Sequence, residues 1–204
     1  MKKNKGKFIS FEGPEASGKS TQILLLKKYL KLKKIPFVIT REPGGTKFAE
    51  NLRKLILSNR TNLNNLEEIL LLMAGRSNHI NNIILPNLKK GKIVITDRFA
   101  DSTFVYQGFV NKFGISKVKK LHFELLDNFY PNYTFIFNLS ANEIIKRLKK
   151  RKNKNKYDKN NLNFHNDIIK GYKKISNNNK RYIQIDASLS KKIIQNIILK
   201  KLKI

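Results

Sequence analysis

A glycine-rich loop between a predicted strand and a predicted helix is the feature that most constrains the fold of this chain. Residues 8–11 are aromatic and β-branched around one serine, a pattern typical of a short buried strand. Directly after it, Gly13-x4-Gly18-Lys19-Ser20 matches the full pattern of a phosphate-binding loop. Glycines let the backbone aim its N–H groups at a polyphosphate, and the helix that begins near Lys19 adds its positive N-terminal end. We therefore expect a nucleotide-phosphate site here.

Each residue type in this loop suits a part of that task. Lys19 can reach the β- and γ-phosphates of a nucleoside triphosphate, and the Ser20 hydroxyl is placed to ligate Mg²⁺. The alternative is a chance match in a lysine-rich turn, but the order of strand, loop and helix favours the phosphate site. The predicted ATP-binding residues are the whole loop, Gly13, Pro14, Glu15, Ala16, Ser17, Gly18, Lys19, Ser20 and Thr21.

The length and composition of the chain favour one α/β domain. Its 204 residues can bury a substantial core and no linker divides them, so we expect a single domain over residues 1–204. The lack of cysteine excludes disulfides and thiolate metal sites and suits a cytoplasmic location. The apolar run after the basic N-terminal segment is too short for a signal peptide, and no apolar stretch has the length of a membrane span. We therefore expect no membrane association.

The net charge of +29 allows two interpretations. Lysine and arginine release counterions when they neutralise phosphates, which would favour a nucleic-acid-binding surface. The lysines are spread along the whole chain, however, and they accompany abundant asparagine, isoleucine, phenylalanine and tyrosine. This favours a solvated surface with a biased composition, which would bind nucleic acid only non-specifically.

Short apolar runs alternate with amphipathic helical patterns along the chain. The runs predict five strands, at 8–11, 35–40, 92–96, 133–139 and 181–185. Alternating strands and helices predict a P-loop fold with a five-stranded parallel sheet and helices on both faces. Ligands bind such sheets beyond the carboxyl ends of the strands. The glycine loop, residues 41–46 and residues 97–98 are therefore expected to meet at one edge.

Two stretches between the strands have particular patterns. Asn64 with Glu67 predicts the start of a long helix, with a kink or break near Pro86 and an end at Gly91. Residues 149–163 are polar, basic and nearly free of aliphatic side chains, so they are expected to be a short mobile lid or a disordered insert.

Asp97 closes the third predicted strand. An acidic residue at this place in a P-loop protein is the expected second partner of Mg²⁺, directly or through water. The alternative role is to cap the following helix, which aspartate also does well. The sequence favours the Mg²⁺ role.

Three arginines stand out because most of the positive charge is lysine. Arg41 and Arg98 flank predicted strand ends, and the planar guanidinium fork matches phosphate oxygens. Arg76 lies in the middle of the long apolar helix, where a snorkelling side chain or a core ion pair is the alternative. If Arg76 points toward the strand ends, the three arginines would hold an acceptor phosphate near the γ-phosphate of ATP.

Phosphoryl transfer onto a phosphate needs positioning and charge neutralisation but no protein nucleophile. The lack of a Ser-His-Asp or Cys-His constellation is therefore no objection to this reaction. His79, His122 and His165 have no metal-ligand spacing, so surface or packing roles are expected for them.

Several motifs together resemble the thymidylate kinase family of bacterial type. They follow the order and spacing of that family over nearly the whole chain, as Phe11 to Thr21, Thr40 to Thr46, Asp97 to Phe99, Ser102-Thr103 and Tyr106 to Gly108. The Arg41-Glu42-Pro43-Gly44-Gly45-Thr46 stretch separates this family from other small nucleotide kinases. The resemblance implies the reaction of ATP with dTMP to give ADP and dTDP, with Mg²⁺ as cofactor, and a homodimer.

The resemblance also implies roles for individual residues. Lys19 and the loop backbone would bind the ATP phosphates, Arg98 with Arg76 would hold the dTMP phosphate, and Arg41 would lie close to both. Tyr106 would crowd the sugar and help to exclude a ribose 2′-hydroxyl. The implied substrate-binding residues are Arg41, Pro43, Gly44, Leu72, Arg76, Arg98, Ser102, Thr103, Tyr106 and Gln107.

The remaining implied roles concern the lid and the metal. Glu15 stands where eukaryotic-type enzymes have a basic residue, which resembles the bacterial arrangement with a catalytic arginine in the lid. Arg151 is the favoured lid arginine and Arg147 the second choice, so that the predicted catalytic residues are Lys19, Arg41, Arg98 and Arg151. The predicted metal ligands are Ser20, Asp97 and Glu15.

Two positions depart from the family pattern. Leu72 stands where the family commonly stacks a phenylalanine on thymine, which removes the aromatic stacking contribution. Residues 155–158 replace the usual Asp-Arg-x-Glu of the lid, so that Lys156 keeps a charge without the arginine fork.

Two other functions remain as alternatives. A deoxynucleoside kinase on the same fold would need a carboxylate base near the 5′-hydroxyl and would have less use for Arg76 and Arg98. A basic, ATP-responsive nucleic-acid-binding protein would need a selected patch of charge. For the homodimer, the helical stretches at Ile69–Leu88 and Val118–Phe129 are candidates for the interface, or they belong to the ordinary core.

Overall fold

A single parallel sheet forms the centre of the protein. The computed structural model describes residues 6–58, 60–150, 161–177 and 179–204. The strands follow the order β2-β3-β1-β4-β5, and every pair is parallel. Their bounds are β1 (Lys7–Glu12), β2 (Phe37–Arg41), β3 (Ile93–Asp97), β4 (Tyr133–Asn138) and β5 (Tyr182–Asp186). This confirms the predicted α/β fold with five parallel strands.

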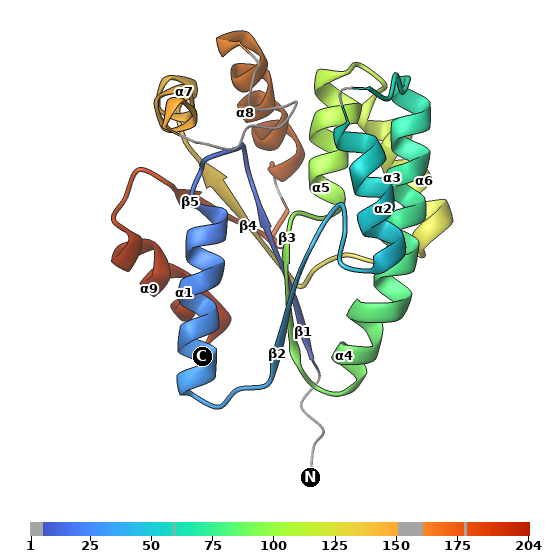
Figure 1. Ribbon diagram of the computed structural model, residues 1–204. Coiled ribbons are helices and arrows are strands. Elements are labelled where there is room, and N and C mark those ends of the chain that lie inside the picture. Colours follow the sequence, from blue (N-terminus) through green and yellow to red (C-terminus); the bar gives the residue numbers. More distant parts are fainter. Residues whose placement is uncertain (1–5, 59, 151–160, 178) are drawn as a thin grey trace.

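Helices cover both faces of this sheet (Figure 1). One face carries α1 (Lys19–Leu32), α7 (Ala141–Lys149) and α9 (Lys191–Leu202). The opposite side carries α2 (Lys47–Leu57), α3 (Asn65–His79), α4 (Leu85–Lys89), α5 (Ala100–Thr103), α6 (Ile115–Leu126), α8 (Leu162–Ser176) and the π-helical turns η1 (Ile80–Ile84) and η2 (Phe104–Val110). The predicted two-layer covering of the sheet is therefore confirmed.

Alternation along the strands divides the core into two apolar clusters. Phe8 packs into the cluster beneath α3, α6 and α8, whereas its neighbour Ile9 packs into the cluster beneath α1, α7 and α9. Successive side chains of a strand point to opposite faces, so a strand that is buried on both sides reads as a continuous apolar run. This is the reason that residues 8–11 could be recognised as a buried strand.

The long helix predicted from Asn64 begins as expected and then changes its geometry. Asn64 and Glu67 form a complete capping box, with Asn64 Oδ1 accepting from Glu67 N at 2.9 Å and Glu67 Oε2 accepting from Asn64 N at 2.8 Å. The expected irregularity is the wider turn η1, just before Pro86. Pro86 itself lies in the first turn of α4, where its missing N–H is tolerated. The last helical residue is Lys89, and Gly91, with a φ of 73°, follows the C-cap, so the helix closes at this glycine as predicted.

Other boundaries differ from the predictions by one or a few residues. The helix expected near residues 102–109 is the short α5 followed by η2, and the last strand begins at Tyr182. Ser140 caps α7 by accepting from Glu143 N at 3.4 Å. Most of the proposed lid, with Arg151 and Lys156, lies outside the described residues.

The register brings three strand ends to the same level. Phe11 of β1 and Arg41 of β2 both pair with Asp97 of β3. The loops that follow these strands therefore leave the sheet side by side, as the sequence predicts. Within the described ranges, none of the helices has both the length and the apolar character needed to cross a membrane.

Candidate active site

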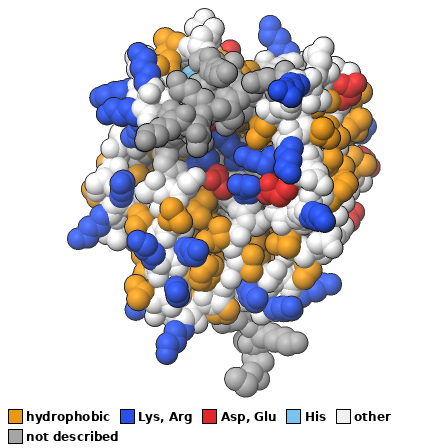
Figure 2. All heavy atoms as spheres, viewed as in Figure 1, with side chains coloured by type: hydrophobic (Ala, Val, Ile, Leu, Met, Phe, Trp, Pro, Cys, Tyr) orange, Lys and Arg blue, Asp and Glu red, His pale blue; other side chains and the backbone are white. Residues whose placement is uncertain are grey.

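A cavity of about 310 Å³ lies where the three strand ends meet. Figure 2 shows basic and acidic side chains gathered around a hollow in this region. Most of the residues proposed from the sequence line it, namely Glu15, Ala16, Lys19, Ser20, Arg41, Pro43, Leu72, Arg76, Asp97, Arg98, Ser102, Thr103, Tyr106 and Gln107. Residues from the glycine loop and from the α3 side of the molecule thus share one cavity.

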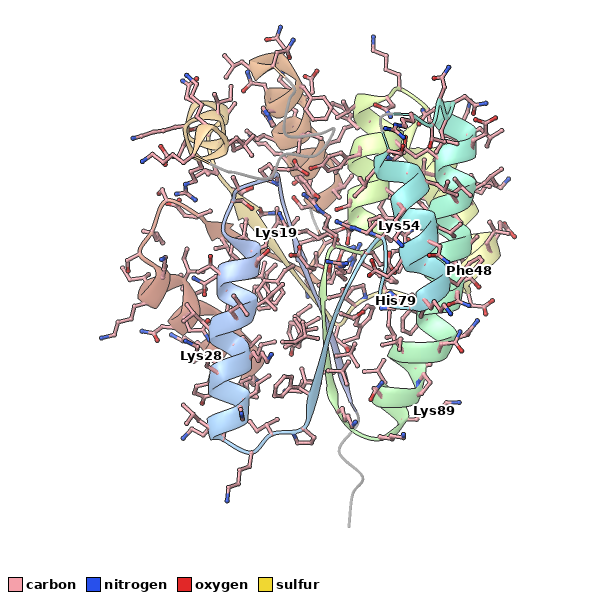
Figure 3. The ribbon with its side chains drawn as sticks, in the orientation of Figure 1. Lys19, Lys28, Phe48, Lys54, His79 and Lys89 are labelled. Carbon is pink, nitrogen blue, oxygen red and sulfur yellow. The ribbon has the colours of Figure 1, made fainter. Side chains whose placement is uncertain are left out.

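The glycine loop curves tightly at its start. Gly13 has a φ of 131°, and a Cβ there would lie 2.6 Å from the backbone oxygen of Phe137. Lys19, in the first turn of α1, arches back over the loop and donates to the carbonyls of Gly13 at 3.0 Å and Pro14 at 2.7 Å. Burial, with the positive charge of Arg98 nearby, lowers the pKa of Lys19 to about 8. Figure 3 shows Lys19 at the end of α1 that faces the strand ends.

Ser20 and Asp97 meet at the edge of this loop. Ser20 Oγ donates to Asp97 Oδ2 at 2.9 Å. The capping alternative for Asp97 is wrong, because the N-cap residue of α5 is Phe99. A hydroxyl and a carboxylate in contact form an oxygen pair that suits Mg²⁺, which takes few protein ligands and completes its shell with phosphates and water. The described residues contain no group of three or more His, Asp or Glu side chains that could hold a metal ion by themselves.

Glu15, which is buried, and Arg98, which is partly buried, form an ion pair beside Tyr106. Arg98 Nη2 donates to Glu15 Oε1 at 2.8 Å, and the Tyr106 hydroxyl donates to Glu15 Oε2 at 2.7 Å. Burial alone would raise the pKa of Glu15, but Arg98 and Lys19 hold that pKa below its usual range. The other guanidinium nitrogen, Arg98 Nη1, donates to Ser102 Oγ at 3.0 Å. Both oxygens of Glu15 are thus committed to these two partners, and metal binding by Glu15 would require it to leave them.

Arg76 lies in the cavity wall and is also part of a core ion pair. Its Nε donates to Glu42 Oε2 at 2.7 Å, and its Nη2 donates to Thr103 Oγ1 at 2.7 Å. The second oxygen of Glu42 lies 2.9 Å from His79 Nδ1, and His79 Nε2 lies 2.6 Å from Thr40 Oγ1. The core ion pair considered for Arg76 is therefore present, and the same residue lines the cavity, where holding an acceptor phosphate stays a prediction.

All three histidines are fully buried, so the surface role considered for them is wrong and the packing role is right. His79, labelled in Figure 3, is the last residue of α3 and contacts Thr40 of β2 and Glu42 just after it. His122 Nε2 lies 2.9 Å from the carbonyl of Phe129, and burial lowers the pKa of His122 to about 4.

Two arginines line the mouth of the cavity from β2 and α2. Arg41 is 54% exposed and pairs with Glu50 at 2.8 Å. Arg53 also lines the cavity, and its Nη1 donates to the carbonyl of Pro43 at 2.8 Å. Sequence reasoning missed Arg53, although it is one of the few arginines in a lysine-rich chain and the same signal that selected Arg41 could have selected it.

Sequence reasoning also missed a buried carboxylate at the end of β1. Glu12 accepts hydrogen bonds from Phe99 N at 2.6 Å, Ser102 Oγ at 2.6 Å and the Tyr172 hydroxyl at 3.0 Å. Burial, with the charge of Asp101 nearby, raises the pKa of Glu12 to about 7. Glu12 thus ties β1 to the loop after β3 and to α8.

Arg147 lies on the other side of the glycine loop. Its guanidinium donates to the carbonyls of Ala16 at 3.4 Å and Ala187 at 3.3 Å, and to Glu143 at 3.1 Å. It lines a second cavity at the ends of β4 and β5. The second choice among the lid arginines is therefore adjacent to the loop, whereas Arg151 lies outside the described residues.

Comparison with known proteins gives one consistent result. The family model described as thymidylate kinase matches residues 11–198. A thymidylate kinase of Caldicellulosiruptor saccharolyticus is 41% identical over 183 residues, covering 90% of this chain and 89% of its own. One of Rickettsia bellii is 40% identical over 205 residues, covering 100% of this chain and 98% of its own. A crystal structure of the thymidylate kinase of Ehrlichia chaffeensis superimposes with a TM-score of 0.78 at 32% identity, over 98% of this chain and 99% of that one.

Proposed function

The chain belongs to the thymidylate kinase family, and from this membership we infer that it transfers the γ-phosphoryl group of ATP to dTMP, giving ADP and dTDP. The structural observation that best supports the inference is that the glycine loop and the predicted nucleoside-binding residues line the same cavity. One end is formed by the glycine loop with Lys19, and the other by Leu72 and Gln107. Donor phosphates and an acceptor nucleotide would meet between them.

We propose that the glycine loop and Lys19 bind the β- and γ-phosphates of ATP. Lys19 Nζ now contacts two loop carbonyls, and a bound triphosphate offers it stronger, charged acceptors. Ser20 and Asp97 would hold Mg²⁺, which supplies positive charge to the phosphates when it is bound. The hydrogen bond between these two side chains supports the assignment.

The acceptor phosphate would be held by the cavity arginines. Arg98 lies at the same strand end as Asp97, Arg76 adds positive charge from the α3 side, and Arg41 adds charge at the mouth. The dTMP phosphate is itself the nucleophile, so the arginines contribute by holding it in line and neutralising charge. Arg147 and Arg151 remain the candidates for the lid arginine.

The nucleoside would occupy the side of the cavity lined by Leu72, Thr103, Tyr106 and Gln107. The Tyr106 hydroxyl is fixed by Glu15, so its ring is held at a defined place beside the sugar. This supports the expected exclusion of a ribose 2′-hydroxyl. A deoxynucleoside kinase is disfavoured by the same site, because a thymidine acceptor has no phosphate for Arg98 and Arg76 to neutralise.

We also propose a cytoplasmic homodimer. Exposed apolar side chains lie on α3 and α6, at Leu66, Leu70, Phe123 and Leu125, each 47% to 55% exposed. The two helices lie on the same side of the sheet, so a second copy of the chain would cover these side chains together. ATP as the donor supports the cytoplasm as the place of action. We expect binding to nucleic acid to remain non-specific.

A panel of nucleoside monophosphates with ATP and Mg²⁺ tests the function. We expect dTMP to be phosphorylated with the highest kcat/KM, and turnover of dTMP no faster than that of the other monophosphates would refute the substrate assignment. Lys19→Ala should lower kcat/KM by about 100-fold or more, because it removes a charged group from the transferring phosphates. Lys28→Ala, which removes an exposed lysine from the same helix (Figure 3), is the matched control and should leave activity unchanged.

A further inference from the structure

A buried carboxylate lies at the nucleoside side of the cavity and holds the amide of Gln107. Glu68 and Gln107 both line the cavity and are 6% and 3% exposed. Gln107 Nε2 donates to Glu68 Oε1 at 3.0 Å. We propose that Glu68 is a positioning residue, which fixes the direction of the Gln107 amide and thereby makes the site select for thymine over cytosine. This proposal rests on the function proposed above.

Glu68 and Gln107 are positioned by the helical segments to which they belong, α3 and η2. Glu68, Leu72 and Arg76 are spaced four residues apart on α3, so they share the face of the helix that lines the cavity. The backbone carbonyl of Gln107, in η2, accepts from Phe113 N at 3.2 Å and from Asn65 Nδ2 at 3.4 Å. Gln107 is thus anchored at its backbone and at the end of its side chain.

An ionised carboxylate can only accept hydrogen bonds, whereas an amide has a donating and an accepting end. Glu68 therefore requires the nitrogen of the Gln107 amide to face it, and a rotation of the amide by half a turn would bring two acceptors together. The oxygen, Oε1, is the end left for a ligand. In the part of the chain that the structure describes, no residue donates a hydrogen bond to Gln107 Oε1.

An accepting oxygen at this place discriminates between pyrimidines. Thymine carries a ring N–H between its two carbonyls, which an acceptor can bind. Cytosine has a lone pair on the same ring nitrogen, so it would leave two acceptors facing each other in a buried site. A site built around such a hydrogen bond can reject the wrong partner far more strongly than a site that measures size alone.

Glu68→Gln tests this directly. The substitution preserves the shape of the side chain but lets it donate or accept, so that the Gln107 amide can turn either way. We expect the ratio of dTMP to dCMP affinity, measured by calorimetry, to fall by about 10-fold or more, mostly through tighter binding of dCMP. Glu68→Asp, which is too short to keep the contact, should lower the same ratio. Glu124→Gln on the exposed surface of α6 is the matched control and should leave the ratio unchanged.

A second substitution separates this role from a merely structural one. In a Gln107→Leu background, Glu68→Gln should change the ratio by less than about twofold, because Glu68 acts through Gln107. The proposal would be overturned if Glu68→Gln changed the affinity ratio in the Gln107→Leu background as much as in the wild type. It would also be overturned if Glu68→Gln lowered the affinity for both nucleotides equally, or if the wild-type protein bound dCMP as tightly as dTMP. Binding is measured without turnover, so a protein that binds dTMP selectively but does not phosphorylate it would refute the proposed function and leave this inference supported.

Discussion

Burial of Lys19 narrows the pH range over which its side chain is charged. Its ammonium is enclosed by the glycine loop, and burial with the nearby Arg98 lowers its pKa to about 8. A lysine in water keeps its charge to a pH of about 10. The charge that would hold ATP phosphates is therefore lost at a lower pH than in an ordinary lysine.

This pKa predicts a pH dependence of ATP binding. Below pH 8 the free protein carries the charged ammonium, and above it the neutral amine must first gain a proton, so affinity should fall by up to about 10-fold per pH unit. Calorimetric titration with ATP between pH 7 and 9.5 measures the effect. Lys19→Arg keeps its charge over this range and should remove the step at pH 8. A step of the same size in that variant would assign the titration to another group.

Replacing Leu72 is expected to increase the affinity for dTMP, whereas most substitutions in a binding site lower it. It lines the cavity on α3 without an aromatic face. Leu72→Phe should bind dTMP about 2- to 10-fold more tightly, since aromatic pairs add about 0.5–1.5 kcal/mol beyond burial. Binding of ATP alone should not change, and a loss of dTMP affinity would mean that the cavity has no room for the ring.

Functional residues could be predicted where neighbours along the chain form a motif. They could not be predicted where the interacting residue is distant in the sequence. Lys19, Ser20 and Asp97 could be found because a loop motif and a strand end are local patterns. The partners of Glu12, Glu42 and Glu68 gave no local signal, because each carboxylate holds a side chain or backbone group on another element. The position of Arg41 at the end of the second strand was predicted correctly. Its exposure and its ion pair with Glu50 could not be predicted from the sequence.

Among the elements, the loop after β2 fits tightly against α3. Gly45 has a φ of 89°, and a Cβ there would lie 2.5 Å from Thr40 Oγ1 and 2.6 Å from His79 Nε2. These are the two atoms that hydrogen-bond each other across the loop. A glycine is needed at this position for its backbone angle and for the lack of a side chain.

Gly45→Ala should therefore lower the free energy of unfolding by about 1–3 kcal/mol, the usual range for a strained backbone position. Gly75→Ala is the matched control, because it lies inside α3 and its Cβ would meet Ala49 at an ordinary 3.6 Å. This control should be stabilised by about 0.5–1 kcal/mol, as expected for alanine in place of glycine in a helix. Urea denaturation followed by circular dichroism measures both. Equal stability of the two variants would contradict the steric argument.

Strands and long helices could be predicted from their periodicity, and so could an irregularity near Pro86, but the π-helical geometry of η1 and η2 could not. β1 and α3 carry strong local signals, a buried apolar run and a capping box. The turns η1 and η2 lie within stretches for which the sequence pattern predicts ordinary helix. No periodicity in these segments distinguishes a π-helical turn from an α-helix, since such turns occur as rare single turns inside α-helices.

For the whole molecule, the surface combines a high positive charge with local apolar patches. A net charge of +29 makes the chains repel each other at low salt, and the apolar side chains of α3 and α6 favour association. The oligomeric state is therefore expected to depend on salt, with the dimer favoured as ionic strength rises.

Leu70→Lys should shift the protein from dimer to monomer, because it places a charge in the proposed apolar interface. Leu24→Lys is the matched control, since Leu24 is 57% exposed on α1 at the opposite face of the sheet. Sedimentation velocity at physiological salt distinguishes the two. A wild-type protein that sediments as a monomer at micromolar concentration would exclude the dimer.

Glu12 receives hydrogen bonds from side chains that are 90 and 160 positions further along the chain, at Ser102 and Tyr172. During translation, Glu12 is therefore synthesised long before Tyr172, its hydrogen-bond partner. Nascent chains whose α8 is still inside the ribosome cannot form this contact. In arrested chains of increasing length, the hydrogen bond between Glu12 and Tyr172 should therefore form only once residue 172 has cleared the exit tunnel.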